Sequence, residues 1–237
     1  MWQFMPKEKS KSIQAMDELQ ATLRPFLKEL GFRARSRALN RPTSDGLTQV
    51  IEFQLGRFDP PGTNIVGFHQ NLYGKFTVNV GVYVPEVHKY AHAFSGGDGQ
   101  AFVHEYDCDI RARLGNLGPE HRDIWWDLDA AKVHDQAADV FQRLERDAFA
   151  FFSQFEDRDA ILNRLMREAK SPFTNRPRLV CAIILAARGK RDEAQSLLIA
   201  HANEHNDHRH LAFLRTLADK LGLAGPDLSV DFIPPRS

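Results

Sequence analysis

The sequence predicts an α+β fold, in which one helix and about four antiparallel strands form a two-layer arrangement followed by an all-helical half. Three patterns support this prediction. Apolar residues recur at helical spacing from Ile13 to Leu30, alternate with polar residues in four later segments, and return to helical spacing after Asp129. We therefore expect an α+β sheet domain over residues 1–130 and a helical extension over residues 131–237.

The first predicted helix is followed by Gly31, a residue suited to a helix C-cap. Pro25 lies inside the helical pattern. Because proline lacks a backbone N–H and crowds the preceding turn, we expect it to kink or split this helix.

The clearest strand signal is residues 75–85, KFTVNVGVYVP, where every second residue is apolar. Such alternation predicts a strand with one face on a core and the other face free. Residues 32–41, 47–58 and 106–114 alternate in the same way. Residues 124–128, IWWDL, fit either a fifth strand or the approach to a helix.

Helical spacing continues through the second half of the chain. The predicted helices cover residues 133–155, 161–166, 178–188, 192–205 and 208–221. The last of them ends at Gly222, and Gly189 lies in the short connection between the third and the fourth.

Charge and composition restrict the classes of function. The 31 basic and 31 acidic residues balance, which argues against a general polyanion binder. Basic residues are nevertheless in excess near the start, with nine against four acidic residues in residues 1–41. Cys108 and Cys181 lack the spacing of a metal site and suit a reducing compartment. No stretch approaches the roughly 18 apolar residues of a membrane span, so we expect a cytoplasmic protein.

Five ordered pieces of the sequence resemble a bacterial family catalogued as a domain of unknown function (DUF), number 4304. They are LGFRARSRALNR, VIEFQ, FTVNVGVYVPEV, IRARLGNL and WWDL, and they lie within residues 15–130. The resemblance implies a small α+β domain and supplies no catalytic residues. Because members of such families often lie beside genes of polymorphic toxins, it also implies an immunity role as a hypothesis.

A separate piece, CAIILAARGKRDEAQSLL, resembles a tetratricopeptide helix pair and covers residues 181–198. A solenoid of such repeats needs about three units, and the sequence has one. We therefore expect a single helical hairpin near residues 178–205, of a kind that usually serves protein contacts.

If the predicted strands pair, their polar positions collect on one face of the sheet. The candidate binding residues are Arg33, Arg35, Arg37, Glu52, Gln54, Thr77, Asn79, Tyr83, Asp107, Asp109, Arg111 and Arg113. Arginine offers a planar set of donors that suits carboxylates and phosphates, so this face could recognise an acidic loop. The alternative is a solvated face on which opposite charges pair across strands.

Two groups of histidines raise the alternative of a metal-dependent hydrolase. The first group is His88, His92, His104 and Asp107, and the second is His201, His205, His208 and His210. A helical turn over residues 86–94 would place the first two rings on one face, as two metal ligands require. Neither group contains an HExxH motif, so we expect no bound metal and no cofactor.

Catalytic nucleophiles are hard to find in this sequence. Neither a GxSxG motif nor a P-loop is present. The alternation predicts that Cys108 faces the apolar side of its strand as an inert thiol. The leading hypothesis is therefore a non-catalytic module that binds a protein partner through the polar sheet face; neither nucleic acid nor a membrane is an expected partner.

Overall fold

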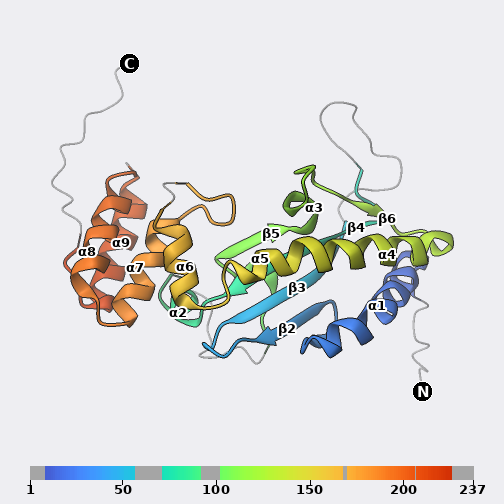
Figure 1. The fold of residues 1–237 in the computed structure, drawn as a ribbon. Coiled ribbons are helices and arrows are strands. Elements are labelled where there is room, and N and C mark those ends of the chain that lie inside the picture. Colours follow the sequence, from blue (N-terminus) through green and yellow to red (C-terminus); the bar gives the residue numbers. More distant parts are fainter. Residues whose placement is uncertain (1–8, 57–70, 92–101, 168–169, 206, 226–237) are drawn as a thin grey trace, which may run out of the picture. The chain divides into compact units, whose positions relative to one another are not determined.

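A computed structural model describes residues 9–56, 71–91, 102–167, 170–205 and 207–225 (Figure 1). Contacts group the chain into two compact units. The first comprises Met1–Tyr83 and Ala101–Gln154, and the second comprises Val84–Gln100 and Phe155–Ser237. Residues 131–154 thus belong with the sheet by contact, whereas the sequence-based division after residue 130 places them in the helical half.

The first unit is built on an antiparallel sheet, which has six strands among the described residues (Figure 1). The strands are β1 (Arg33–Arg35), β2 (Ala38–Pro42), β3 (Thr48–Leu55), β4 (Lys75–Tyr83), β5 (Ile110–Arg113) and β6 (Trp126–Asp127). Strands β1 to β5 follow one another across the sheet, and β6 pairs with the start of β4. The predicted antiparallel sheet is confirmed, and the IWWDL run contains a short strand.

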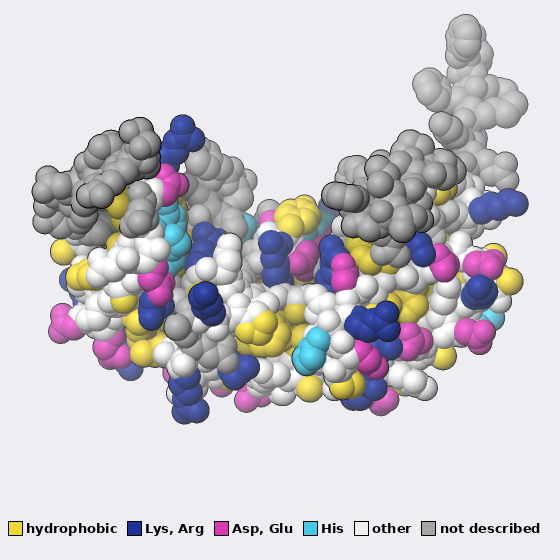
Figure 2. Space-filling model, turned by 90° about the horizontal axis from the view of Figure 1, so that it is seen from above, with side chains coloured by type: hydrophobic (Ala, Val, Ile, Leu, Met, Phe, Trp, Pro, Cys, Tyr) yellow, Lys and Arg dark blue, Asp and Glu magenta, His cyan; other side chains and the backbone are white. Residues whose placement is uncertain are grey.

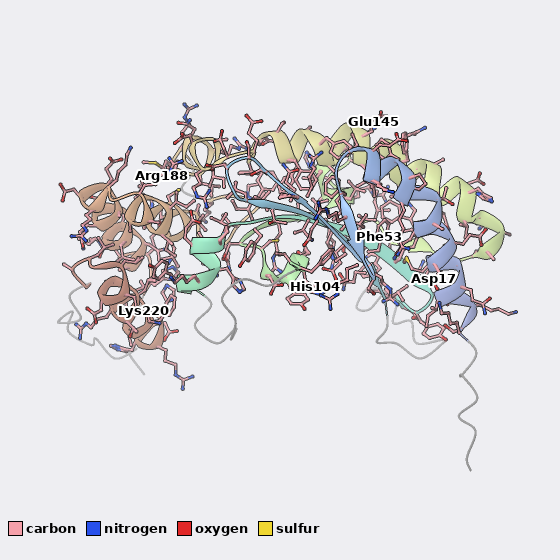
Figure 3. All side chains as sticks on the ribbon, turned by 90° about the horizontal axis from the view of Figure 1, so that it is seen from below. Asp17, Phe53, His104, Glu145, Arg188 and Lys220 are labelled. Atoms are coloured by element: carbon pink, nitrogen blue, oxygen red, sulfur yellow. The ribbon has the colours of Figure 1, made fainter. Side chains whose placement is uncertain are left out.

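One face of the sheet is apolar and packs against helices. Ile51 and Phe53 on β3 pair with Val80 and Val78 on β4, and all four side chains are fully buried. The helices on this side are α1 (Lys11–Glu29), α4 (Val133–Arg143) and α5 (Phe149–Ser153). Figure 3 shows Glu145, between α4 and α5, on one side of the strands and His104 on the other.

Helix α1 runs through Pro25 without a break, so the predicted split did not occur. The next residue, Phe26, packs on α4, where its ring centroid lies 4.3 Å from that of Phe141. Helices α4 and α5 are joined by a π-helical turn, η3 (Leu144–Ala148), and together they form the long helical run predicted over residues 133–155.

The second unit consists of helices in its described part. They are α2 (Pro85–Ala91), α6 (Arg158–Leu165), α7 (Pro177–Ala187), α8 (Arg191–Ala202) and α9 (His208–Leu221). Helices α7 and α8 form the predicted hairpin, which turns at Gly189 with a φ of 76°. Arg158 on α6 donates two hydrogen bonds to Glu86 on α2, at 2.6 and 2.8 Å. None of the described helices has the length and apolar character needed to cross a membrane.

Candidate functional site

The strand register places most of the candidate binding residues on one face of the sheet, the polar face. Glu52 on β3 pairs with Asn79 on β4, and Asn79 pairs with Arg113 on β5. Because paired residues point to the same face of a sheet, these three side chains lie on one face. The residues that share this face are Arg33 and Arg35 on β1, Glu52 and Gln54 on β3, Thr77, Asn79 and Tyr83 on β4, and Arg111 and Arg113 on β5.

Three candidate residues lie outside the strands. Arg37 is in the turn between β1 and β2, and Asp109 directly precedes β5. Asp107 ends a 3₁₀ turn, η1 (Glu105–Asp107), where its carboxylate accepts a hydrogen bond from the backbone N–H of His104. The strand predicted from residue 106 therefore begins only at Ile110, because this local side-chain cap favours a turn.

Residues 102–109, here called the covering segment, lie over the middle of the polar face. Asn40 on β2 donates to the carbonyl of Val103 at 2.8 Å and accepts from its N–H at 2.7 Å. Glu52 on β3 accepts from the N–H of Glu105 at 2.8 Å and lies 3.0 Å from Nδ1 of His104. The sequence predicted a free face, but its centre is occupied by the chain itself.

Cys108 belongs to the covering segment and packs directly on Gly81 of β4. A Cβ atom at Gly81 would lie 2.8 Å from both Cβ and Sγ of Cys108. Since Gly81 pairs with Val50 and Arg111, it lies on the polar face, so Cys108 covers that face rather than the apolar one as predicted. Cys108 is nevertheless buried, and burial raises the pKa of its thiol well above the ordinary value.

We expect neither thiol of the native protein to react with an aromatic disulfide reagent at pH 8. Only the thiolate attacks, and burial also raises the pKa of Cys181 to about 12. Spectrophotometric titration should detect negligible release of the reagent's coloured thiolate from the native protein in buffer. In denaturant it should detect two equivalents of that thiolate, one for each cysteine of the chain. Rapid release of one equivalent from the native protein would show that one of the two thiols is accessible.

Several polar residues on β4 are also closed to a large partner. Asn79 is 7% exposed and donates to Gln54 at 2.8 Å. Tyr83 is buried, and burial followed by the charge of Asp107 raises its pKa. Thr77 is fully buried, and its hydroxyl has no hydrogen-bond partner among the described residues.

The β5 side of the polar face is exposed, but its charges are neutralised locally. Arg113 forms an ion pair with Asp123 and lies 5.1 Å above the ring of Trp125. Arg111 lies 3.6 Å from the carboxylate of Glu105. The exposed ring of Tyr106 stacks on the ring of His104, with the two centroids 5.1 Å apart, and takes no part in these ion pairs.

The β1 edge of the sheet differs, because Arg33 borders a groove that β1 forms with helix α1, on the helix-covered side of the sheet. All three residues of β1 are exposed, and no described carboxylate pairs with Arg33 or Arg35. Between β1, the start of β2 and helix α1 lies a cavity of about 610 Å³, here called the basic groove. It is lined by Ala21, Arg24, Pro25, Lys28, Phe32, Arg33, Ala34 and Leu39.

The basic groove combines an apolar floor with three cationic side chains. Phe32 and Leu39 are buried in the floor, while Arg24, Lys28 and Arg33 supply the charge. Arg24 is oriented by hydrogen bonds to the side chain of Gln20 and to the carbonyl of Ser36, both 3.1 Å long. Sequence reasoning found Arg33 but missed Arg24 and Lys28; the excess of basic residues near the start of the chain was the available signal.

The first histidine group does not appear among the clusters of three possible metal ligands found in the described residues. His88 is buried in the second unit, whereas His104 and Asp107 belong to the first, and His92 lies outside the described residues. The ring of His104 is engaged by Glu52. The second group brings three of its four histidines together, at positions 201, 205 and 210.

Comparison with known proteins gives one match. A family model described as "Domain of unknown function (DUF4304)" matches residues 23–154, more than half of the chain. The matched range ends at Gln154, where the sheet unit also ends. Comparison with curated proteins and with solved structures gave no match.

Proposed function

The chain belongs to the DUF4304 family, and we propose that it is a non-catalytic protein-binding module whose contact surface is the basic groove together with the exposed strand β1. The single observation that carries this proposal is the groove itself, an apolar depression bordered by Arg24, Lys28 and Arg33. Its partner would be an acidic segment of another protein that presents an apolar side chain to the floor.

The size and the lining of the groove support this choice of partner. Its volume of about 610 Å³ is in the range of recognised binding pockets, which hold an apolar body and a few fixed polar groups. No described carboxylate pairs with Lys28 or Arg33, so their charges remain available to a partner. Complementary charge guides association and selects against basic partners.

The distribution of charge favours a protein over a nucleic acid. On the face that Figure 2 shows, basic and acidic side chains are interspersed, without a broad basic area. The net formal charge of zero agrees with that view. Nucleic-acid binding depends on many basic contacts to phosphates, and a groove with three cations supplies few of them.

Neutralisation of a toxin is a specific form of this function. An immunity protein needs only to cover part of its toxin, and the basic groove offers such a contact without any catalytic group. Under this form of the proposal, the captured partner is a toxin, and the protein relieves its toxicity when both are produced together.

Affinity capture from the native host lysate tests the proposal, with Lys28→Glu/Arg33→Glu as the groove variant. The matched control is Arg122→Glu/Lys132→Glu, which changes the charge equally at two exposed positions of the same unit. We expect wild type and control to retain a partner with an acidic segment, and the groove variant to lose it. Equal retention by wild type and groove variant would contradict the proposal.

A further inference from the structure

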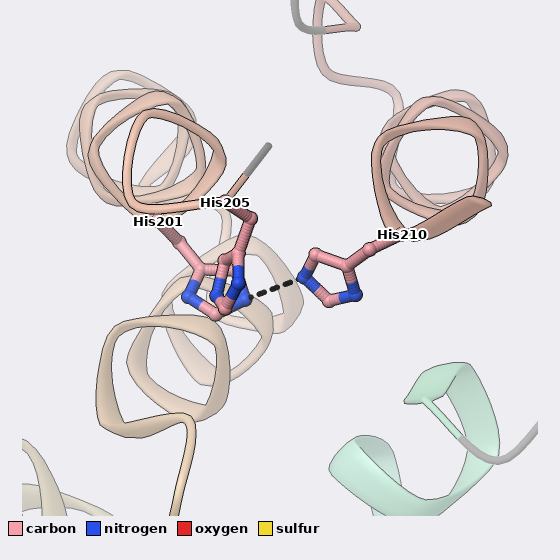
Figure 4. A group of neighbouring side chains, drawn as sticks. All are labelled: His201, His205 and His210. Carbon is pink, nitrogen blue, oxygen red and sulfur yellow. Dashed lines mark hydrogen bonds between the residues drawn. The ribbon is translucent and has the colours of Figure 1, made fainter. Parts of the chain in front are cut away.

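Three histidines of the second unit turn their rings toward a common point (Figure 4). His201 is in the last turn of α8, His205 follows that helix, and His210 is in the first turn of α9. The rings of His201 and His205 lie side by side, with their centroids 4.6 Å apart. His210 lies opposite them.

The ring nitrogens are close enough to share one ion. Nε2 of His201 lies 3.1 Å from Nε2 of His210. One nitrogen from each of the three rings lies within 4.8 Å of the others. With Zn–N bonds of 2.0–2.1 Å, the ligand nitrogens of a tetrahedral zinc site are about 3.3 Å apart. Small side-chain rotations would convert the observed arrangement into that geometry.

Burial favours the neutral form of two of the three imidazoles, which is the form that binds a metal. Burial lowers the pKa of His201 to about 4, and the neighbouring His205 and His210 contribute in the same direction. Burial also lowers the pKa of His210. At neutral pH these two rings are therefore uncharged, and each has a nitrogen lone pair available.

We propose that His201, His205 and His210 bind a zinc ion that joins the end of α8 to the start of α9. Imidazole ligands suit zinc and related transition metals, whereas magnesium and calcium prefer oxygen ligands. Three protein ligands leave the fourth tetrahedral position to a water molecule. His205 and His210 are only partly buried, so an ion can reach the site from solvent.

An acidic group lies near the site, although beyond hydrogen-bond distance of His201. The carboxylate of Glu204 lies 4.0 Å from Nδ1 of His201, the nitrogen that does not face His210. A carboxylate on the outer nitrogen orients a metal-bound imidazole and increases its basicity. Glu204 is itself held by an ion pair with Arg178.

The charges near the site partly cancel. Arg176 and Arg178 act on His201 as positive charges, which is unfavourable for a cation. Glu204 pairs with Arg178, and Asp207 places a negative charge near His210. A hydrogen bond between two neutral rings is the alternative to a metal, but it explains only His201 and His210 and leaves the approach of His205 unexplained.

Zinc titration of the tag-free, chelator-treated full chain tests the proposal, because a polyhistidine tag would itself bind the metal. We expect calorimetry and elemental analysis to find one zinc ion per chain, and zinc to raise the melting temperature. Cobalt(II) in place of zinc should give the strong visible absorption of a tetrahedral site. The cobalt spectrum is read on the wild-type chain and does not depend on a variant that folds.

His205→Ala and His210→Ala should each weaken zinc binding by more than about 100-fold, the upper figure for loss of an outer-shell partner alone. The matched control is His134→Ala, an exposed histidine of the first unit that should leave zinc binding unchanged. Failure of the wild type to take up zinc, or wild-type affinity in both variants, would overturn the proposal and leave a hydrogen-bonded histidine cluster.

Discussion

Replacing Asn40 by alanine is expected to release the covering segment from the sheet and to lower the free energy of unfolding by about 2–6 kcal/mol, from a cost of about 1–3 kcal/mol for each of the two buried polar groups left unpaired. The Asn40 side chain bonds both the N–H and the C=O of Val103, which is 4% exposed. Alanine removes both partners at once. Urea unfolding gives the stability change, and hydrogen exchange should show lost protection in residues 102–109.

An exposed asparagine provides the control for this experiment. Asn163 lies on the surface of α6, so its change to alanine should alter the free energy of unfolding by less than about 0.5 kcal/mol. If Asn40→Ala is as stable as wild type and residues 102–109 remain protected, the covering segment is not held by Asn40.

A methyl group at Gly81 is expected to cost about 1–3 kcal/mol of stability, the usual range for overpacking a buried site. The added Cβ would meet Cβ and Sγ of Cys108 at 2.8 Å and the carbonyl of Ile110 at 3.3 Å. Either the covering segment lifts or β4 shifts. Chemical denaturation of Gly81→Ala measures the loss.

A double-mutant cycle identifies the cause of that loss. Cys108→Gly removes the two nearest atoms, so Gly81→Ala should be much less destabilising in that background than in wild type. Strictly additive effects of the two changes would show that Cys108 does not limit the space above Gly81.

Local pattern predicted the strands well because alternation is itself a local property. Residues 75–83 alternate as predicted and form β4, the strand that pairs with three others. The same pattern failed at residues 106–109, where a side-chain cap from Asp107 forms a 3₁₀ turn. Alternation assigns a residue to a face, but it does not reveal what covers that face.

The roles of Asn40 and Glu52 could not be derived from the sequence. Their partners in the covering segment are 52 to 63 residues away along the chain, and only the folded sheet brings them together. A polar residue on a strand can be a binding residue or an internal anchor. Glu52 was predicted as a binding residue, and in the structure its carboxylate contacts His104 and Glu105 of the covering segment.

Neither the basic groove nor the histidine cluster could be predicted in full from local sequence pattern, because each combines residues of separate elements. Strand alternation predicted Arg33 as a candidate binding residue. Arg24 and Lys28 belong to helix α1, and the position of that helix against β1 depends on packing. The spacing of His201 and His205 was visible in the sequence. The approach of His210 depends on the turn between α8 and α9, which no periodicity predicts.

The most direct test of the proposed function is a selection of random peptides on the immobilised, tag-free protein. We expect the selected peptides to carry aspartate or glutamate around an apolar residue. Their affinity should fall at least about tenfold, equivalent to 1.4 kcal/mol, in Lys28→Glu/Arg33→Glu and remain unchanged in Arg122→Glu/Lys132→Glu. Selected peptides without acidic residues, or peptides that bind the groove variant as tightly as wild type, would contradict the assignment of the basic groove as the binding surface.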